Sequence, residues 1–169
     1  SKAACENLVH AYSNLYGIKA IVLRYANVVG PRLRHGVIYD LLMKLKRDKE
    51  KLEVLGNGMQ IRSYIYIDDA VEATIVAWRR GSKKLNIFNI ASEDWIAVND
   101  VVATLLEVLN LKKIRIIFKP VLHGVGWPGD VKRVALDISK VKSLGWKPKM
   151  SSREAITKAI KDILNESLY

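Results

Sequence analysis

The chain has 169 residues, half of them hydrophobic, and a formal net charge of +11. This length suits one domain or one large fragment, and the apolar fraction is sufficient for a buried core. Apolar runs such as residues 20–23 are too short to span a bilayer, and the basic residues do not alternate with aromatic ones, so we expect neither a membrane nor a nucleic-acid partner. The single cysteine, Cys5, excludes an internal disulfide and a cysteine-built zinc site and fits a cytoplasmic protein.

The first third of the chain predicts a helix, a strand, a loop and a second helix. Apolar residues at positions 4, 8, 11 and 15 form a helical stripe that ends at Gly17. Residues 18–25 form an almost continuous apolar run, which predicts a buried strand. Gly30 and Pro31 mark the loop after it. Val37 and the leucines at 41, 42 and 45 then predict the second helix.

The middle of the chain contains a turn signal between two β-prone runs. Residues 52–55 and 62–67 flank the glycine pair of residues 56–58, which predicts a hairpin or a related connection. Asp68 or Asp69 is expected to cap a third helix. Alanines at positions 70, 73 and 77 give that helix a small-residue face that allows close packing.

The last part of the chain continues the alternation of strands and helices. Strands are predicted at residues 85–90 and 114–118, with a helix marked by apolar residues from 98 to 109 between them. Asp137 is expected to cap a short helix, and Ser151 with Glu154 forms the capping box of a last helix. The alternation predicts an α/β protein with mostly parallel strands. Because the first strand follows a helix, we expect further strands upstream.

Four motifs resemble, in order and spacing, the epimerase/dehydratase branch of the extended short-chain dehydrogenase/reductase family. They lie within residues 1–6, 23–32, 52–69 and 127–148. The resemblance implies the C-terminal part of a Rossmann-like parallel sheet plus a smaller mixed α/β substrate-binding domain. Residues 1–34 would end the dinucleotide-binding domain. Residues 35–169 would mainly bind the nucleotide sugar, with some segments returning to the Rossmann sheet.

The first motif contains the pair Ser1 and Lys2. In the family, a catalytic tyrosine stands four residues before this lysine, which places it before residue 1. The tyrosine exchanges a proton with a sugar hydroxyl while hydride moves to or from nicotinamide, and a cation one helical turn away lowers its pKa. The resemblance therefore implies that Lys2 is catalytic and binds the nicotinamide ribose. Taken alone, Lys2 would be an ordinary exposed lysine.

The second motif follows the first predicted strand into a loop. The C-terminal edge of a strand is where α/β sheets place ligands. The resemblance implies that Tyr25 lies near the nicotinamide and that Asn27 binds the nucleotide diphosphate. The alternative for Asn27 is a turn cap.

The third motif supplies the cation expected to bind the diphosphate. Arg62 matches the family arginine, whose planar fork can bond phosphate oxygens bidentately. The backbone from Glu53 to Leu55 resembles the segment that contacts the nucleobase edge. The family usually has aspartate directly after the arginine, whereas this chain has Ser63, a difference that bears on the support of Arg62. The alternative for Arg62 is a surface strand arginine.

The fourth motif ends in Asp130, which the resemblance implies accepts a hydrogen bond from the nucleotide ribose. Many family members have an arginine three residues earlier, where this chain has Trp127. One expected phosphate contact is therefore lost. Lys132, Arg133 and His123 are candidates to replace it.

No glycine-rich turn that could hold the NAD pyrophosphate is found within the 169 residues. We expect this turn and the catalytic tyrosine upstream, and we expect the chain alone to be inactive. The implied activity of the intact enzyme is that of an NAD-dependent epimerase of the UDP-glucose 4-epimerase type. A 4,6-dehydratase, a reductase and a non-catalytic module that binds nucleotides or other polyanions remain alternatives.

The expected partners are therefore NAD in the intact enzyme and a nucleotide sugar, with UDP as the expected nucleotide. No metal site is expected, because His10, His35 and His123 lack ligand-like spacing. The sequence identifies neither the sugar nor the oligomeric state, for which a homodimer is one alternative.

Overall fold

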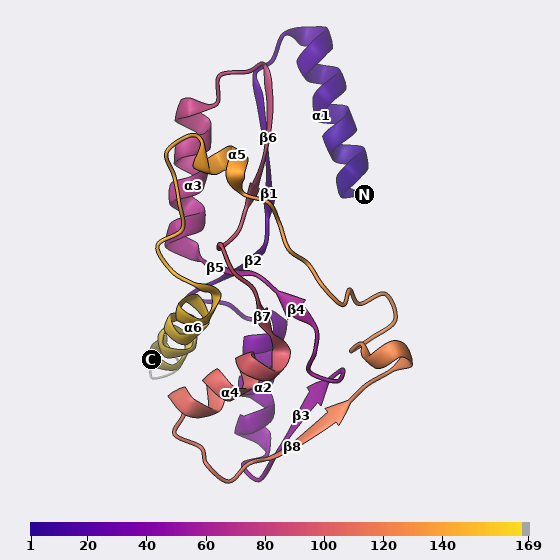
Figure 1. The fold of residues 1–169 in the computed structure, drawn as a ribbon, viewed down its shortest axis with the longest axis vertical. Coiled ribbons are helices and arrows are strands. Elements are labelled where there is room, and N and C mark those ends of the chain that lie inside the picture. The colour runs from indigo at the N-terminus through magenta and orange to yellow at the C-terminus, as the bar shows by residue number, and fades with distance from the viewer. Residues whose placement is uncertain (167–169) are drawn as a thin grey trace.

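The computed structural model describes residues 1–166, apart from the side chain of Leu122. The molecule is elongated, with an upper and a lower part in the orientation of Figure 1. The upper part is built on the parallel pair of β1 (Ala20–Tyr25) and β6 (Leu85–Ile90). α1 (Lys2–Tyr16) lies on one side of this pair and α3 (Ile67–Arg80) on the other.

α3 packs closely because its inner face consists of alanines. Ala70, Ala73 and Ala77 are each at most 3% exposed and belong to the same core cluster as Phe88 and Ile90 of β6. The expected small-residue face is thus confirmed. It lets the helix backbone approach the strands.

The lower part combines helices with a second parallel strand pair. β3 (Lys51–Leu55) pairs with β8 (Arg115–Lys119), and α2 (Gly36–Arg47) and α4 (Val98–Val108) pack nearby. Every second residue of β3 is buried, as expected for a strand with one face on a core. The parallel pairing of β1 with β6 and of β3 with β8 agrees with the predicted α/β class.

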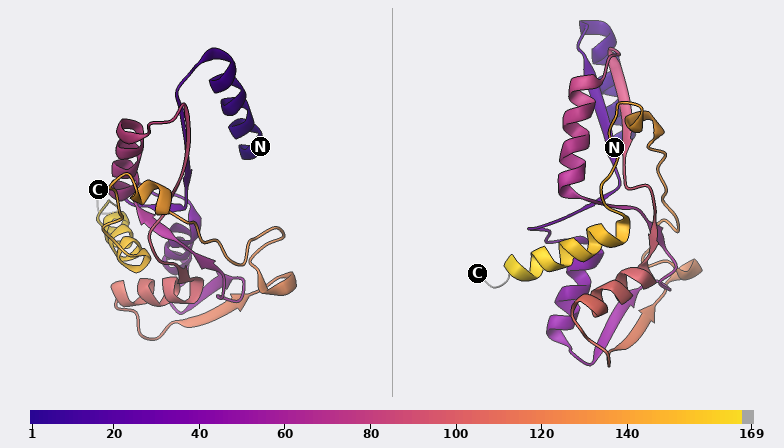
Figure 2. Two further views of the ribbon diagram at one scale, coloured as in Figure 1. Left: turned by 45° about the horizontal axis from the view of Figure 1, so that its top comes forward. Right: turned by 60° about the vertical axis from the view of Figure 1, so that its left-hand side comes forward.

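Short strands and α6 join the two parts. β2 (Asn27–Val29) pairs in parallel with β5 (Tyr64–Tyr66), and β4 (Ile61–Arg62) pairs antiparallel with β7 (Ile96–Ala97). α6 (Ser152–Glu166) lies between the upper and lower parts in Figures 1 and 2. The remaining elements are the 3-10 turn η1 (Leu122–Gly124) and the short helix α5 (Ser139–Lys142).

The turn at residues 56–58 does not form a hairpin between its flanking strands. β3 pairs with β8 and β4 with β7, so the hairpin alternative is wrong and the related connection is what forms. The second β-prone run is also divided, because Ser63 separates β4 from β5. The chain changes partners at this point. Local β-propensity does not reveal such a change.

The acidic pair before α3 does not cap that helix. The N-cap residue is Tyr66 and no side-chain capping bond forms, so the prediction for Asp68 or Asp69 is wrong. Asp69 is buried and instead accepts hydrogen bonds from the backbone N–H groups of Lys149 and Met150, at 3.0 and 3.3 Å. It therefore ties α3 to the chain before α6.

Two other expectations about helices had different outcomes. Glu154 accepts from the backbone N–H of Ser151 at 2.7 Å and donates its own backbone N–H to the Ser151 hydroxyl at 3.3 Å, which confirms the capping box. On α1, the apolar stripe is exposed: Leu8 is 59% and Leu15 75% accessible. The α1 residue that is buried is Ser13, whose hydroxyl donates to Ile18 O. Within residues 1–166, no helix is long and apolar enough to cross a membrane.

Candidate functional site

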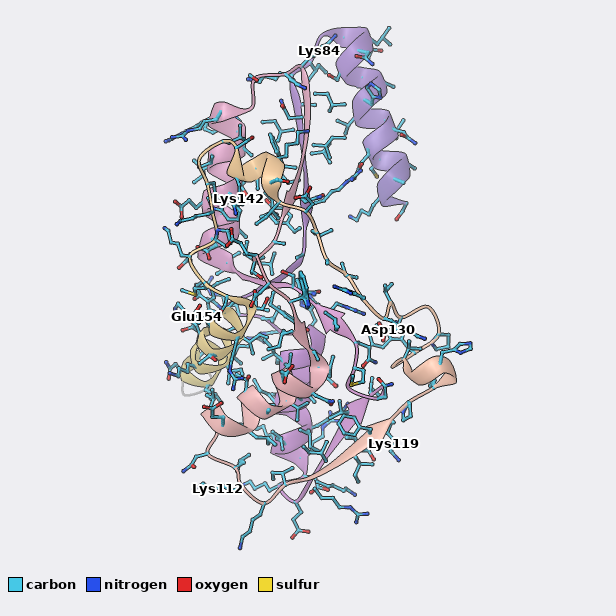
Figure 3. The ribbon with its side chains drawn as sticks, in the orientation of Figure 1. Lys84, Lys112, Lys119, Asp130, Lys142 and Glu154 are labelled. Atoms are coloured by element: carbon cyan, nitrogen blue, oxygen red, sulfur yellow. The ribbon has the colours of Figure 1, made fainter. Side chains whose placement is uncertain are left out.

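A cavity of about 810 Å³ lies where the short strands meet the lower part. Its walls come from β2, the start of α2, the end of β3, β4 and the loop that ends at Asp130. Most of the lining residues are apolar, and a few polar side chains converge on them, which is the usual composition of a small-molecule site. Figure 3 shows Asp130 on the long loop that follows β8.

Arg62 lies on β4, and its cationic side chain lines this cavity. Its Nη2 donates to Asp130 Oδ1 at 2.8 Å, and its Nη1 donates to Ile61 O at 2.8 Å. The side chain of Arg62 is 16% exposed and that of Asp130 only 2%. The pair is therefore nearly desolvated, and removing one partner would leave the other charge uncompensated.

β4 is held in place on both sides. It pairs with β7 on one side, and Ile61 exchanges backbone hydrogen bonds with Lys132 and Val134 on the other, at 2.9 and 3.1 Å. This second contact brings the chain after Asp130 next to β4. Arg62 and Asp130, which are 68 positions apart in the sequence, therefore come into contact.

The two oxygens of Asp130 have different partners. Oδ1 accepts from Arg62, whereas Oδ2 accepts from Gly126 N at 3.0 Å and from Gln60 Nε2 at 3.4 Å. The support of Arg62 thus comes from Asp130. Ser63 instead bonds to Ser92, at 2.8 Å between the two hydroxyl oxygens.

The remaining substrate-site candidates are partly brought together. Asn27 and Leu55 line the cavity with Arg62 and Asp130, and Asn27 Nδ2 donates to Ser63 O at 3.2 Å. Glu53 does not line it: its side chain is about half exposed and lies 3.8 Å from Lys119 Nζ. Its neighbours on β3 do contribute to the wall, so only the backbone role expected for residues 53–55 has a geometric basis.

The two cofactor-site candidates lie outside this cavity. Lys2 is exposed in the first turn of α1, at the end of the helix nearer the lower part in Figure 1, and no ion pair to it is found in residues 1–166. The Tyr25 hydroxyl bonds to Thr74 Oγ1 at 2.5 Å, while 42% of the residue remains exposed. Both roles therefore stay predictions.

Three cavity residues had no role assigned from sequence. Gln60 is 4% exposed, Tyr64 is 5% exposed, and His35 directly precedes α2. Burial raises the pKa of the Tyr64 hydroxyl to about 12, so it stays protonated at neutral pH. The even-numbered residues from 52 to 60 are all buried, but the sequence does not signal this, because the apolar Leu55 and Met59 are exposed between them.

No group of three histidine, cysteine or acidic side chains that could hold a metal ion is found among the described residues. The family model described as the NAD dependent epimerase/dehydratase family matches residues 1–91. The chain belongs to this family.

Individual relatives agree with this membership. A UDP-galactose 4-epimerase structure is 40% identical, with a TM-score of 0.83, and the match covers 99% of this chain and 52% of that one. The UDP-glucose 4-epimerase of Thermotoga maritima, solved with UDP-glucose, is 32% identical with a TM-score of 0.83, over 99% and 53% of the two chains. The dTDP-glucose 4,6-dehydratase 1 of Escherichia coli is 28% identical over all of this chain and 47% of its own length. The chain thus spans about half the length of the curated relatives it matches.

Proposed function

We propose that this chain supplies the substrate-binding part of an NAD-dependent nucleotide-sugar epimerase of the UDP-glucose 4-epimerase type. The observation that carries the proposal is the cavity that joins Arg62, Asp130 and Asn27, in a chain whose similar solved structures include UDP-sugar epimerases. The proposed domain organisation assigns residues 1–34 to the end of the dinucleotide-binding domain and residues 35–169 mainly to the substrate domain.

Arg62 is the proposed partner of the diphosphate. Guanidinium has five N–H donors, and Arg62 uses one of them on Ile61 O and one on Asp130. The other donors can meet phosphate oxygens, and the Nη2 donor can be shared with the ligand, because Asp130 keeps Gly126 N and Gln60 Nε2 as partners. Asn27 adds an amide donor in the same cavity.

The residues proposed to hold NAD are Lys2 and Tyr25. Lys2 fits because it is exposed and no ion pair within the described chain occupies it, and Tyr25 because its ring remains partly accessible although Thr74 holds its hydroxyl. When bound, NAD would take a hydride from a sugar carbon and return it to the opposite face. Lys2 would lower the pKa of a tyrosine four residues upstream, so that this tyrosine can remove the hydroxyl proton.

The proposal is tested by giving the complete enzyme UDP-glucose and NAD and following the products. Formation of UDP-galactose supports it. Formation of a 4-keto-6-deoxy sugar nucleotide instead would assign the chain to a 4,6-dehydratase, the second candidate. The similarity of this whole chain to part of the Escherichia coli dehydratase favours that candidate. Binding of UDP without any turnover would favour the non-catalytic module.

A further inference from the structure

Gln60 occupies a constrained position in the wall of the cavity. It follows the turn at residues 56–58 and is 4% exposed. Its carboxamide lies against Gly56, where an added Cβ atom would come within 1.8 Å of Nε2. Gly56 also has a φ of 84°, in the region that favours glycine. The turn therefore leaves space for the Gln60 carboxamide.

The hydrogen bonds of this carboxamide are unevenly satisfied. Nε2 donates to Asp130 Oδ2 at 3.4 Å, whereas Oε1 is buried and has no hydrogen-bond partner within residues 1–166. An unsatisfied buried carbonyl oxygen disfavours the folded state, and such groups often have a role in a site. The presence of an amide at this position is therefore better explained by the hydrogen bond that Nε2 donates to Asp130 than by packing.

We propose that Gln60 is a positioning residue for nucleotide binding, which acts on the diphosphate through Asp130 and Arg62. Gln60 Nε2 and Gly126 N engage Oδ2 of Asp130 and so leave Oδ1 to accept from Arg62. The orientation of the carboxylate sets where the Arg62 fork lies, and phosphate recognition by arginine depends on that geometry. The inference rests on the proposed function, since it takes Arg62 as the diphosphate partner.

The test is a double-mutant cycle that uses UDP and uridine as probes of the complete enzyme. Gln60→Met keeps the size of the side chain and removes both the donor and the unsatisfied oxygen. We expect UDP affinity to fall about 5- to 10-fold, the scale of one hydrogen bond, while uridine affinity changes little. The midpoint of thermal unfolding should stay or rise. In an Arg62→Ala background, Gln60→Met should change UDP affinity less than about twofold.

Asn99→Leu is the matched control. Asn99 also presents a buried, unsatisfied amide oxygen to this turn, against Gly58, but it does not line the cavity or contact Asp130. Its replacement should leave the difference between UDP and uridine affinity unchanged. Gln60→Glu gives a second measure: it restores a donor toward Asp130 only when protonated, so UDP affinity should recover in part as pH falls.

Two results would overturn the inference. One is an equal loss of UDP and uridine affinity in Gln60→Met, and the other is a loss of UDP affinity that persists in full without Arg62. Failure of the proposed function looks different, because the unmodified enzyme would then bind UDP no more tightly than uridine. That result would also remove the diphosphate role on which the inference rests.

Discussion

Arg62 and Asp130 form a nearly buried ion pair inside the candidate site. Desolvation offsets much of the attraction within such a pair, so its value for folding is small compared with the cost of removing one partner. The ion pair is better explained by a contribution to the binding of an anionic ligand. A cation that is already held in the cavity wall loses little side-chain freedom when an anion arrives.

The proposed role of Arg62 predicts that its loss weakens binding of the nucleotide sugar but not of NAD. In the complete enzyme, Arg62→Ala should weaken nucleotide-sugar binding by about 1.5–3 kcal/mol, the scale of a hydrogen bond to a charged group. Affinity for free NAD should barely change. Calorimetric titrations with both ligands measure the difference, and an equal loss for both would mean that Arg62 acts through the fold.

The proposed role of Lys2 predicts that its loss changes the rate of turnover rather than the stability of the fold. In the complete enzyme, Lys2→Ala should slow turnover by about 100-fold or more, because loss of the cation would raise the pKa of the proposed catalytic tyrosine. The pH–rate profile should shift to alkaline pH. The thermal midpoint should hardly move, since Lys2 is exposed in the first turn of α1. An unchanged profile with full activity would show that Lys2 has no catalytic role.

Among the elements, α6 shows most directly how local sequence signals connect to tertiary structure. Its capping box satisfies backbone groups at the helix start, and the next residue, Ser152, continues into a buried hydroxyl network. Ser152 and Ser63 each lie 2.8 Å from the Ser92 hydroxyl, and Tyr64 N donates to Ser152 Oγ at 3.0 Å. This network joins α6 to β5 and to the chain after β6.

The capping box predicts a measurable contribution to stability. Ser151→Ala should lower the free energy of unfolding by about 1 kcal/mol at neutral pH, the usual cost of removing an N-terminal cap. Urea unfolding measures it, with Ser82→Ala on an exposed loop as the control.

The same box predicts a direction for the pH dependence. The hydrogen bonds from Ser151 lower the pKa of Glu154 below its usual 4.5. A carboxyl with a depressed folded-state pKa stabilises the protein above its unfolded pKa, and this stabilisation is lost as pH falls through the folded value. The difference between the unmodified protein and Ser151→Ala should therefore shrink below about pH 4.5. A difference that grows on acidification would contradict this account.

At the scale of the whole molecule, the residues proposed to bind the substrate and those proposed to bind NAD lie mainly in different parts. The lower part contributes most of the cavity, whereas Lys2 and Tyr25 belong to the upper part. The exposed apolar side chains of α1, among them Leu8, Tyr12 and Leu15, also belong to the upper part.

The separation of these roles predicts that the 169-residue chain by itself does not turn over nucleotide sugars. No glycine-rich turn for the NAD pyrophosphate is found within the 169 residues, and the proposed catalytic tyrosine would stand four residues before Lys2. A coupled assay with UDP-glucose and NAD on the purified chain tests this. NAD-dependent epimerisation by the chain alone would contradict the prediction, and it would then be necessary to find another proton donor within these residues.

Local signals in the sequence were sufficient for much of the fold. The alanine face of α3, the alternation in β3 and the capping box of α6 depend on residues a few positions apart, and short-range geometry relates such residues directly. The motif around Arg62 singled out a residue that lines the cavity, whereas its proposed diphosphate role stays a prediction.

Only the tertiary structure decided which distant groups meet. The pairing of β3 with β8 rather than with β4, the bond from Asp69 to the chain before α6, and the contact of Arg62 with Asp130 all join residues more than 60 positions apart. Ser63 shows the same limit, because its hydroxyl bonds to Ser92, 29 residues away, rather than to its neighbour Arg62. Propensity and motif spacing determine what a segment can form, whereas the choice among alternative partners depends on packing the whole chain at once.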